Sequence, residues 1–237
     1  MIDKTLKTCA EAVSTVFDGA TVMLGGFGDP GLPGVLIEAL REHGAKDLWI
    51  IHNGAGQGDY ALAGLMDDGR VRKLTCSFPS HPGNKAFAER YMRGEIELEL
   101  VPQGTLCERI RAAGAGLGGF FTPTGAGTEL AAGKETRMIN GREHVFETPL
   151  SADFAFVRAY QGDRLGNLTY RMAMLNFNVP MCTAAQHVVA EIDELVPAGN
   201  IHPQQVHTPG IFVDHIVPCA RHPALASVVN LQNPGRA

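Results

Sequence analysis

The glycine-rich stretch from Asp18 to Pro33 combines residue types that let a ligand come close to the backbone. The glycines that follow its apolar run, at positions 25, 26, 28 and 31, carry no Cβ atom, so a phosphate, a thiol or a carbonyl group can approach the main chain. An apolar run precedes the glycines and Pro33 opens a periodic apolar run, which predicts a strand, a bare loop and a helix start. Free backbone N–H groups with a helix dipole behind them are typical of anion-binding sites.

The same glycines overlap the dinucleotide-binding pattern, because Gly26, Gly28 and Gly31 have its G-x-G-x-x-G spacing. That pattern also requires an Asp or Glu at the end of the second strand, about 20 residues further on. The second apolar run instead ends in His52 and Asn53. The sequence therefore argues against a dinucleotide site.

Four strand-loop-helix units must position this loop. The expected strands cover residues 21–24, 47–52, 71–76 and 96–101. Their alternation with helical runs predicts an α/β fold of three layers, α/β/α, with a mainly parallel sheet covered on both faces. Ligands of such sheets gather beyond the carboxyl ends of the strands. The loops expected at that edge are residues 25–28, 53–58, 77–83 and 103–104.

The second half of the chain has a different sequence pattern from the four strand-loop-helix units. Residues 114–128 are rich in glycine, and we expect them to fold across the sheet because Leu117, Phe120 and Phe121 need burial. The Asn140-Gly141 pair, between two strand-like runs, predicts a β-hairpin with a type I′ turn. Later strands are expected at residues 152–160, 188–192 and 211–217, and the tail from about residue 219 is expected to be peripheral. We expect one domain over residues 1–237.

Composition narrows the class of protein. The formal charge of −5 argues against nucleic acid or an anionic membrane as the main partner. The five cysteines are scattered without a C-x-x-C pair, so neither a disulfide framework nor a zinc site is indicated, and we expect reduced thiols and a cytoplasmic protein. No H-x-x-x-H or H-E-x-x-H spacing suggests a metal. No apolar segment approaches the ~18 residues of a membrane span.

The order Asp18-Gly19, three apolar residues, Gly25-Gly26-Phe27, then Gly31-x-Pro33 resembles the signature of the small (A) subunit of family I CoA-transferases. The resemblance covers nearly the whole chain. It extends through residues 97–128, 133–137, 152–171, 176–178 (Asn-Phe-Asn) and 208–214. The Ser-Phe-Pro at 77–79 and Gly-Gly-Phe-Phe at 118–121 are most similar to the 3-oxoadipate branch.

This resemblance implies a reaction that moves CoA from succinyl-CoA to a 3-oxo acid through a glutamate of the B subunit, with no cofactor or metal. In the family that glutamate lies in a Ser-Glu-Asn-Gly motif, which this sequence lacks. A partner B subunit, and an A2B2 assembly, are therefore implied. The fold it implies is shared with sugar-phosphate isomerases and deaminases.

The resemblance also implies site residues. The segment that surrounds the CoA thioester corresponds to Gly25, Gly26, Phe27, Gly28, Asp29, Pro30 and Gly31. Asn53 and Gln103 fall on positions that bind substrate near the reacting carbonyl, and an amide N–H can donate to an oxyanion without changing charge. Relatives usually carry two asparagines where this chain has Asn53-Gly54, so one amide is missing.

Several alternatives stay open at this point. The acceptor could be acetoacetate or another 3-oxo acid, and the chain could instead be a sugar-phosphate isomerase or a CoA-binding subunit without catalysis. Arg109 and Arg111 could contact CoA phosphates or a dicarboxylate, or could be ordinary charges on a helix face. His52, at a strand end, is expected to pack against a loop.

Overall fold

The structure is a computed structural model that describes residues 2–80 and 85–220, and its centre is one large sheet. Seven strands lie in the order β11-β10-β8-β1-β2-β3-β4, all parallel, and the short β9 pairs with β8 in the antiparallel sense. Their bounds are Thr21–Leu24 (β1), Leu48–Ile51 (β2), Val71–Cys76 (β3), Glu97–Leu100 (β4), Ala152–Asp163 (β8), Leu168–Thr169 (β9), Ala185–Val196 (β10) and His215–Pro218 (β11).

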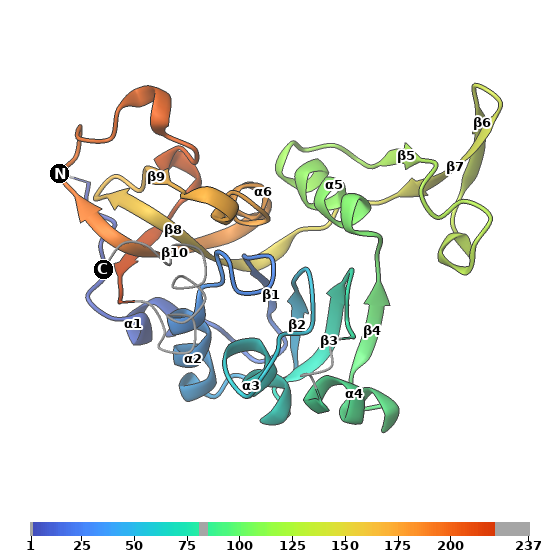
Figure 1. Cartoon of the computed structure of the whole chain (residues 1–237), viewed down its shortest axis with the longest axis horizontal. Coiled ribbons are helices and arrows are strands. Elements are labelled where there is room, and N and C mark those ends of the chain that lie inside the picture. The colour runs from blue at the N-terminus through green and yellow to red at the C-terminus, as the bar shows by residue number, and fades with distance from the viewer. Residues whose placement is uncertain (1, 81–84, 221–237) are drawn as a thin grey trace, which may run out of the picture.

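Helices cover both faces of this sheet, as the sequence predicts (Figure 1). On one face lie α1 (Cys9–Val13), α2 (Gly34–His43), α3 (Ala61–Asp67) and α4 (Lys85–Met92), and on the other lie α5 (Gln103–Gly114) and α6 (Asn178–Ala184). Strand β1 shows why two cores form, because Val22 and Leu24 join the first and Met23 joins the second. Successive side chains of a strand point to opposite faces, so this central strand is apolar at every core position.

The expected hairpin is confirmed. Strands β6 (Thr136–Ile139) and β7 (Arg142–Glu147) pair across Asn140 and Gly141, whose φ angles are +50° and +76°. Positive φ at both central residues is the requirement of a type I′ turn, and Asn and Gly meet it at little cost.

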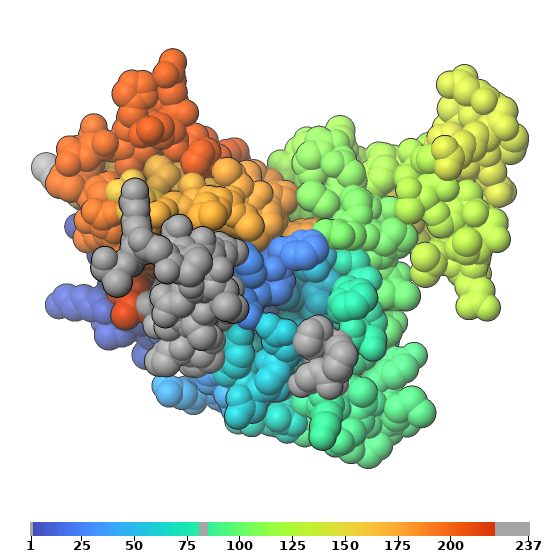
Figure 2. Space-filling model, in the orientation of Figure 1, coloured from blue at the N-terminus to red at the C-terminus, as the bar shows by residue number. Residues whose placement is uncertain are grey.

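The expectation for residues 114–128 is wrong. This segment does not cross the main sheet: β5 (Phe120–Thr122) pairs with β7, and the three strands β5-β7-β6 form a separate small sheet. The small sheet extends from the body as an arm beyond α5 (Figures 1 and 2). Leu117 is 46% exposed and Phe121 packs against Phe146, so the aromatic residues find partners within the arm.

The later strands differ in length from those expected. Strands β8 and β10 are both twelve residues long and extend beyond the predicted ranges. The expected strand at 211–217 divides into a 3-10 turn over Gly210–Phe212 and the strand β11, because Ile211 and Phe212 face solvent and do not join the sheet. Most of the tail expected to be peripheral lies outside the described residues.

Candidate functional site

A cavity of about 620 Å³ lies beyond the carboxyl ends of β1 to β4, at the edge where the sequence predicts ligand binding. The loop between β1 and α2 contributes Phe27 to Pro30 and Leu32 to its wall. The loop after β2 contributes residues 52–57, Tyr60 and Leu62. Ser77 and Phe78 follow β3, and Gln103 begins α5. Four segments that are distant in sequence therefore meet at one site.

The first two loops are joined across the cavity rim by Asp29. Its carboxylate accepts a hydrogen bond from Tyr60 Oη at 2.7 Å and from Gln57 Nε2 at 2.8 Å. Burial, and then the Asp29 carboxylate, raise the pKa of Tyr60, so the phenol stays protonated and donates. Both carboxylate oxygens are thus engaged within the protein.

Asn53 is held by the residue that follows β3. Its side chain is 7% exposed, and its Oδ1 accepts a hydrogen bond from Ser77 Oγ at 2.8 Å. Its backbone carbonyl accepts from the amides of Ser77 and Phe78, which continues the parallel pairing of β2 and β3 into the loops. Within residues 2–80 and 85–220, the amide Nδ2 has no hydrogen-bond partner.

Gln103 is the first residue of α5 and is exposed at the cavity. Its side chain makes no hydrogen bond to any other described residue. The structure thus brings Asn53 and Gln103 to one cavity, each carrying an amide whose nitrogen can donate to a ligand oxygen.

His52 is buried beside Asn53, with 2% of its surface exposed. Its Nδ1 lies 3.0 Å from both the amide and the carbonyl of Gly54. Burial lowers the pKa of this imidazole, which favours the neutral ring. Its Nε2 has no hydrogen-bond partner among the residues described, so one polar atom of the cavity wall is unsatisfied.

The glycines of the first loop have different surroundings. Gly28, with φ +60°, meets nothing within 4 Å where a Cβ would be, and it lines the cavity. Gly25, Gly26 and Gly31 do not line it. A Cβ on Gly25 or Gly31 would overlap the side chain of Asn178, and one on Gly26 would come within 3.0 Å of Leu32. Among the glycines of this loop, Gly28 is therefore the position open to a ligand.

The start of α2 is not free to bind an anion. The amides of Val35 and Leu36 both donate to Oε2 of Glu191, at 2.9 and 3.0 Å. Glu191 is fully buried in β10 and pairs with Arg158 of β8. A carboxylate of the protein therefore occupies the N-terminus of α2, where the sequence predicts an anionic ligand.

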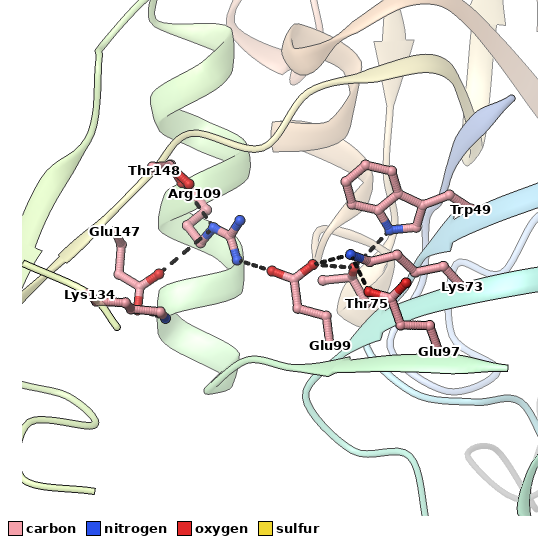
Figure 3. A network of polar contacts seen from close by, with 9 residues as sticks. All are labelled: Trp49, Lys73, Thr75, Glu97, Glu99, Arg109, Lys134, Glu147 and Thr148. Atoms are coloured by element: carbon pink, nitrogen blue, oxygen red, sulfur yellow. Dashed lines mark hydrogen bonds and ion pairs between the residues drawn. The ribbon is translucent and has the colours of Figure 1, made fainter. Parts of the chain in front are cut away.

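Arg109 and Arg111 do not line the cavity. Arg109 Nη1 contacts Glu99 Oε1 at 2.7 Å, and its Nε donates to the carbonyl of Thr148. Figure 3 shows this guanidinium between β4 and the segment that joins β7 to β8. The network of polar contacts continues to Trp49, Lys73, Thr75, Glu97, Lys134 and Glu147. Arg111 is exposed and pairs with Glu108 on the same helix. Arg109 therefore has a structural role between elements of the fold, and Arg111 is a surface charge.

Residues 6–218 match the sequence model of the family described as Coenzyme A transferase. The chain belongs to this family. It is 53% identical over 217 residues to the A subunit of 3-oxoadipate CoA-transferase from Pseudomonas putida, covering 92% of this chain and 94% of that protein. It is 51% identical over 227 residues to the protein of the same name from Acinetobacter baylyi, covering 96% and 100%. The A subunit of a probable succinyl-CoA:3-ketoacid coenzyme A transferase from Bacillus subtilis is 43% identical over 90% of this chain and 89% of that protein.

Solved structures share the fold of this CoA-transferase chain at lower identity. A thioester complex of acyl-CoA transferase from E. coli O157:H7 aligns with a TM-score of 0.81 and 23% identity, over 92% of this chain and 50% of that one. Glutaconate coenzyme A-transferase from Acidaminococcus fermentans gives 0.77 and 21%, over 91% and 75%. The chain thus spans about half the length of the acyl-CoA transferase, and at these identities the likeness is one of fold.

The described part of this CoA-transferase chain contains neither a metal-binding cluster nor a membrane-spanning helix. No group of three or more His, Cys, Asp or Glu side chains there could hold a metal ion. No helix there is long and apolar enough to cross a membrane.

Sequence reasoning found the loops of the site but missed several side chains in them. Tyr60 and Gln57 are not among its candidates, and Ser77 is named only as part of the Ser-Phe-Pro segment, although these residues hold Asp29 and Asn53. The position of Ser77 directly after β3 is a signal that could have found it, because residues after parallel strands share one edge. Nothing local to Tyr60 indicates that its hydroxyl reaches a residue 31 positions earlier.

Proposed function

We propose that this chain is the A subunit of a two-chain CoA-transferase that moves CoA from succinyl-CoA to a 3-oxo acid, with 3-oxoadipate as the acceptor. The observation that carries the choice of acid is the identity of 53% and 51% to two proteins named for 3-oxoadipate, against 43% to the Bacillus subtilis relative. The Ser-Phe-Pro segment supports the same choice, because Ser77 and Phe78 line the cavity.

In this proposal the nucleophile is a glutamate of the partner chain. Its carboxylate attacks the thioester carbon of succinyl-CoA and expels the CoA thiolate, which leaves an acyl-glutamyl anhydride. The thiolate then attacks the glutamyl carbonyl, which releases succinate and leaves a glutamyl-CoA thioester. The carboxylate of the 3-oxo acid repeats the sequence in reverse and takes the CoA. A carboxylate needs no deprotonation at pH 7, so the protein must chiefly stabilise oxyanions and exclude water.

The residues of this chain suit that task. Asn53 and Gln103 offer amide donors at the cavity, and the neutral His52 adds no positive charge that would trap the product acid. Phe27, Pro30 and Phe78 offer apolar surface to the pantetheine arm of CoA. Within the segment Gly25, Gly26, Phe27, Gly28, Asp29, Pro30 and Gly31, the residues from Phe27 to Pro30 are proposed to contact the thioester, with Gly28 at closest approach, while the other three glycines shape the loop behind them.

Reconstitution with the partner tests this function. The neighbouring reading frame is expected to encode a B subunit that contains Ser-Glu-Asn-Gly, and the two chains are expected to form an A2B2 complex in the cytoplasm. The purified complex, supplied with succinyl-CoA, should show a higher kcat/KM for 3-oxoadipate than for acetoacetate. A higher value for acetoacetate would reassign the substrate, and full CoA binding with no transfer to any 3-oxo acid would favour a binding role without catalysis.

One alternative enzyme class has a simple test. A sugar-phosphate isomerase of this fold would act alone and would need a general base within the cavity. In the described cavity wall Asp29 is the one carboxylate, and its two oxygens are bonded to Tyr60 and Gln57. Turnover of a pentose or hexose phosphate by the isolated chain would contradict the proposed function.

A further inference from the structure

The Asn-Phe-Asn segment, residues 176–178, has no role in the function proposed above, yet it lies directly behind the glycine loop. It leads into α6, which packs against α5 and β8. Asn178 is fully buried, and Asn176 is partly buried. Buried side-chain amides usually have hydrogen-bond partners, so the contacts of these two residues indicate what they hold.

Asn178 uses both ends of its amide on backbone groups. Its Oδ1 accepts a hydrogen bond from the amide of Arg158 at 3.0 Å. Its Nδ2 donates to the carbonyls of Gly31 at 3.1 Å and Met174 at 3.0 Å. Because a backbone amide can only donate and a carbonyl can only accept, the orientation of this side-chain amide is fixed by its partners. One side chain therefore ties β8 and the segment before α6 to the glycine loop.

The loop is shaped to fit this side chain. Glycine at positions 25 and 31 is required because a Cβ at either would overlap Asn178, whereas Gly28 has open space. Asn176 adds a second tie, since its Nδ2 donates to the carbonyl of Pro30 at 2.9 Å. The carbonyls of Pro30 and Gly31 are thus bonded to the Asn-Phe-Asn segment.

Two N–H groups of the loop at the cavity are left without a partner in the described structure, whereas those of Gly25, Phe27 and Leu32 are bonded to backbone carbonyls. The amides of Gly28 and Asp29 have no hydrogen-bond partner among residues 2–80 and 85–220, and both residues line the cavity. A thioester or carboxylate oxygen of an acyl-CoA or an acid is the kind of group that such donors bind.

We propose that Asn178 is a positioning residue for CoA transfer: it holds the glycine loop so that the amides of Gly28 and Asp29 face the acyl group of the bound acyl-CoA. This inference rests on the function proposed above. A shift of 1 Å in groups that orient a reacting centre can cost ~10²-fold in rate, so loss of the tie should lower kcat/KM for succinyl-CoA without preventing assembly.

Asn178→Asp in the two-chain complex gives a test that a purely structural role would not pass. A protonated aspartic acid has nearly the shape of asparagine, and its O–H can donate to one carbonyl while its other oxygen accepts from Arg158. An ionised aspartate has no donor and faces two carbonyl oxygens. The ratio of kcat/KM for Asn178→Asp over that of the wild type should therefore fall at least ~10-fold as pH rises from 5.5 to 8.5.

Nearby titrating groups do not obscure this pH dependence. The Cys182 thiol donates to the Asn178 carbonyl at 3.1 Å, and burial raises its pKa to about 12, so it stays protonated throughout. Arg158, which donates its backbone amide to Asn178, uses its side chain to pair with Glu191 and Asp193. Asn178→Ala has no carboxyl group and should be impaired at every pH. Asn167→Ala, which removes a hydrogen-bonded asparagine between Asp163 and Gly210, should leave kcat/KM within about twofold of the wild type.

Hydrogen exchange supplies the readout that does not depend on activity. In Asn178→Ala, the hydrogen-bonded amides of the loop, those of Gly25, Phe27 and Leu32, should exchange at least ~10-fold faster than in wild type, while Asn167→Ala should leave them unchanged. If the wild-type complex transfers no CoA, the proposed function fails and this exchange result alone decides whether Asn178 holds the loop. A pH-independent activity ratio for Asn178→Asp, or unchanged exchange in the loop, would overturn the inference.

Discussion

Asn53, Gln103 and His52 bring hydrogen-bonding groups without net charge to one cavity. Asn53 is fixed by Ser77, His52 is fixed by Gly54, and Gln103 has no partner in the described structure. Neutral donors suit a reaction in which an oxyanion appears only briefly at the reacting carbonyl, because they stabilise that oxyanion without holding the acid product. The site can therefore favour the transition state over either acid.

Gln103→Ala tests the donor at the start of α5. Removing one oxyanion donor typically costs ~10²-fold to 10³-fold in turnover, so kcat of the reconstituted complex should fall by ~10²-fold. The KM for succinyl-CoA should change little, because the contact forms mainly in the transition state. Gln205→Ala, on an exposed 3-10 turn, is the matched control and should retain wild-type kcat. An unchanged kcat in Gln103→Ala would make this residue an ordinary loop amide.

His52 gives a prediction about stability and pH. Burial lowers its pKa in the folded chain, whereas an unfolded histidine binds a proton near pH 6.5. The unfolded state therefore binds more protons as pH falls below that value, and the free energy of unfolding decreases by up to ~1.4 kcal/mol per pH unit down to the lowered folded pKa. Urea unfolding at pH 7.5 and 5.5 should show a smaller decrease in His52→Gln than in wild type. Equal decreases would mean that the buried imidazole takes up a proton in the folded state.

At the scale of elements, the loop between β1 and α2 shows what local sequence can and cannot predict. The apolar run, the glycines and Pro33 predicted its strand, turn and helix, and these are confirmed. The same pattern suggested free amides at the start of α2, yet these bind Glu191, about 155 residues further along the chain. A partner so distant leaves no trace in the pattern of the loop itself. The same applies to Asn178, whose contact explains two of the glycines.

Glu191→Gln tests the contact that begins α2. Glutamine keeps one acceptor for the amides of Val35 and Leu36 but leaves the buried Arg158 without its fully buried counter-charge. Breaking a buried ion pair typically costs 3–5 kcal/mol, so the free energy of unfolding should fall by about 3 kcal/mol. Glu97→Gln removes an exposed charge that pairs with Lys73, and should cost no more than about 1 kcal/mol. Similar losses in urea unfolding of the two variants would show that Arg158 is satisfied without Glu191.

The remaining elements also divide into those that local sequence predicts and those that depend on contacts between distant residues. The Asn140-Gly141 turn was predictable because its conformation is set by two adjacent residues. The course of residues 114–128 was not, because Phe121 could be buried either against the main sheet or within the arm, and only the pairing of β5 with β7 decides between them. Candidate residues Asn53 and Gln103 were identified by resemblance and by their place after strands. Ser77 has the same kind of place, directly after β3, whereas Tyr60 acts through a contact that spacing does not encode.

At the scale of the whole molecule, the cavity has donors and apolar walls but lacks a free carboxylate among its described residues. Asp29 is bonded to Tyr60 and Gln57. Phe27 and Phe78, both at the cavity, are 47% and 62% exposed, so together they present apolar surface that a ligand or a partner chain can cover. These features fit a chain that supplies one side of a shared site.

The isolated chain should therefore transfer no CoA. A carboxylate nucleophile must lie beside the oxyanion donors. Carboxylates outside the cavity wall include buried ones held in ion pairs, such as Glu191 with Arg158, and exposed ones, such as Glu108 with Arg111, on which an anhydride would hydrolyse. In the two-chain complex with succinyl-CoA, borohydride reduction should trap the glutamyl-CoA thioester, and peptide mass mapping should locate it on the partner alone. Asp29→Asn serves as the control for the one carboxylate of the described cavity wall, and it should still form the adduct on the partner. An adduct on this chain, or transfer by this chain alone, would mean that it carries its own nucleophile.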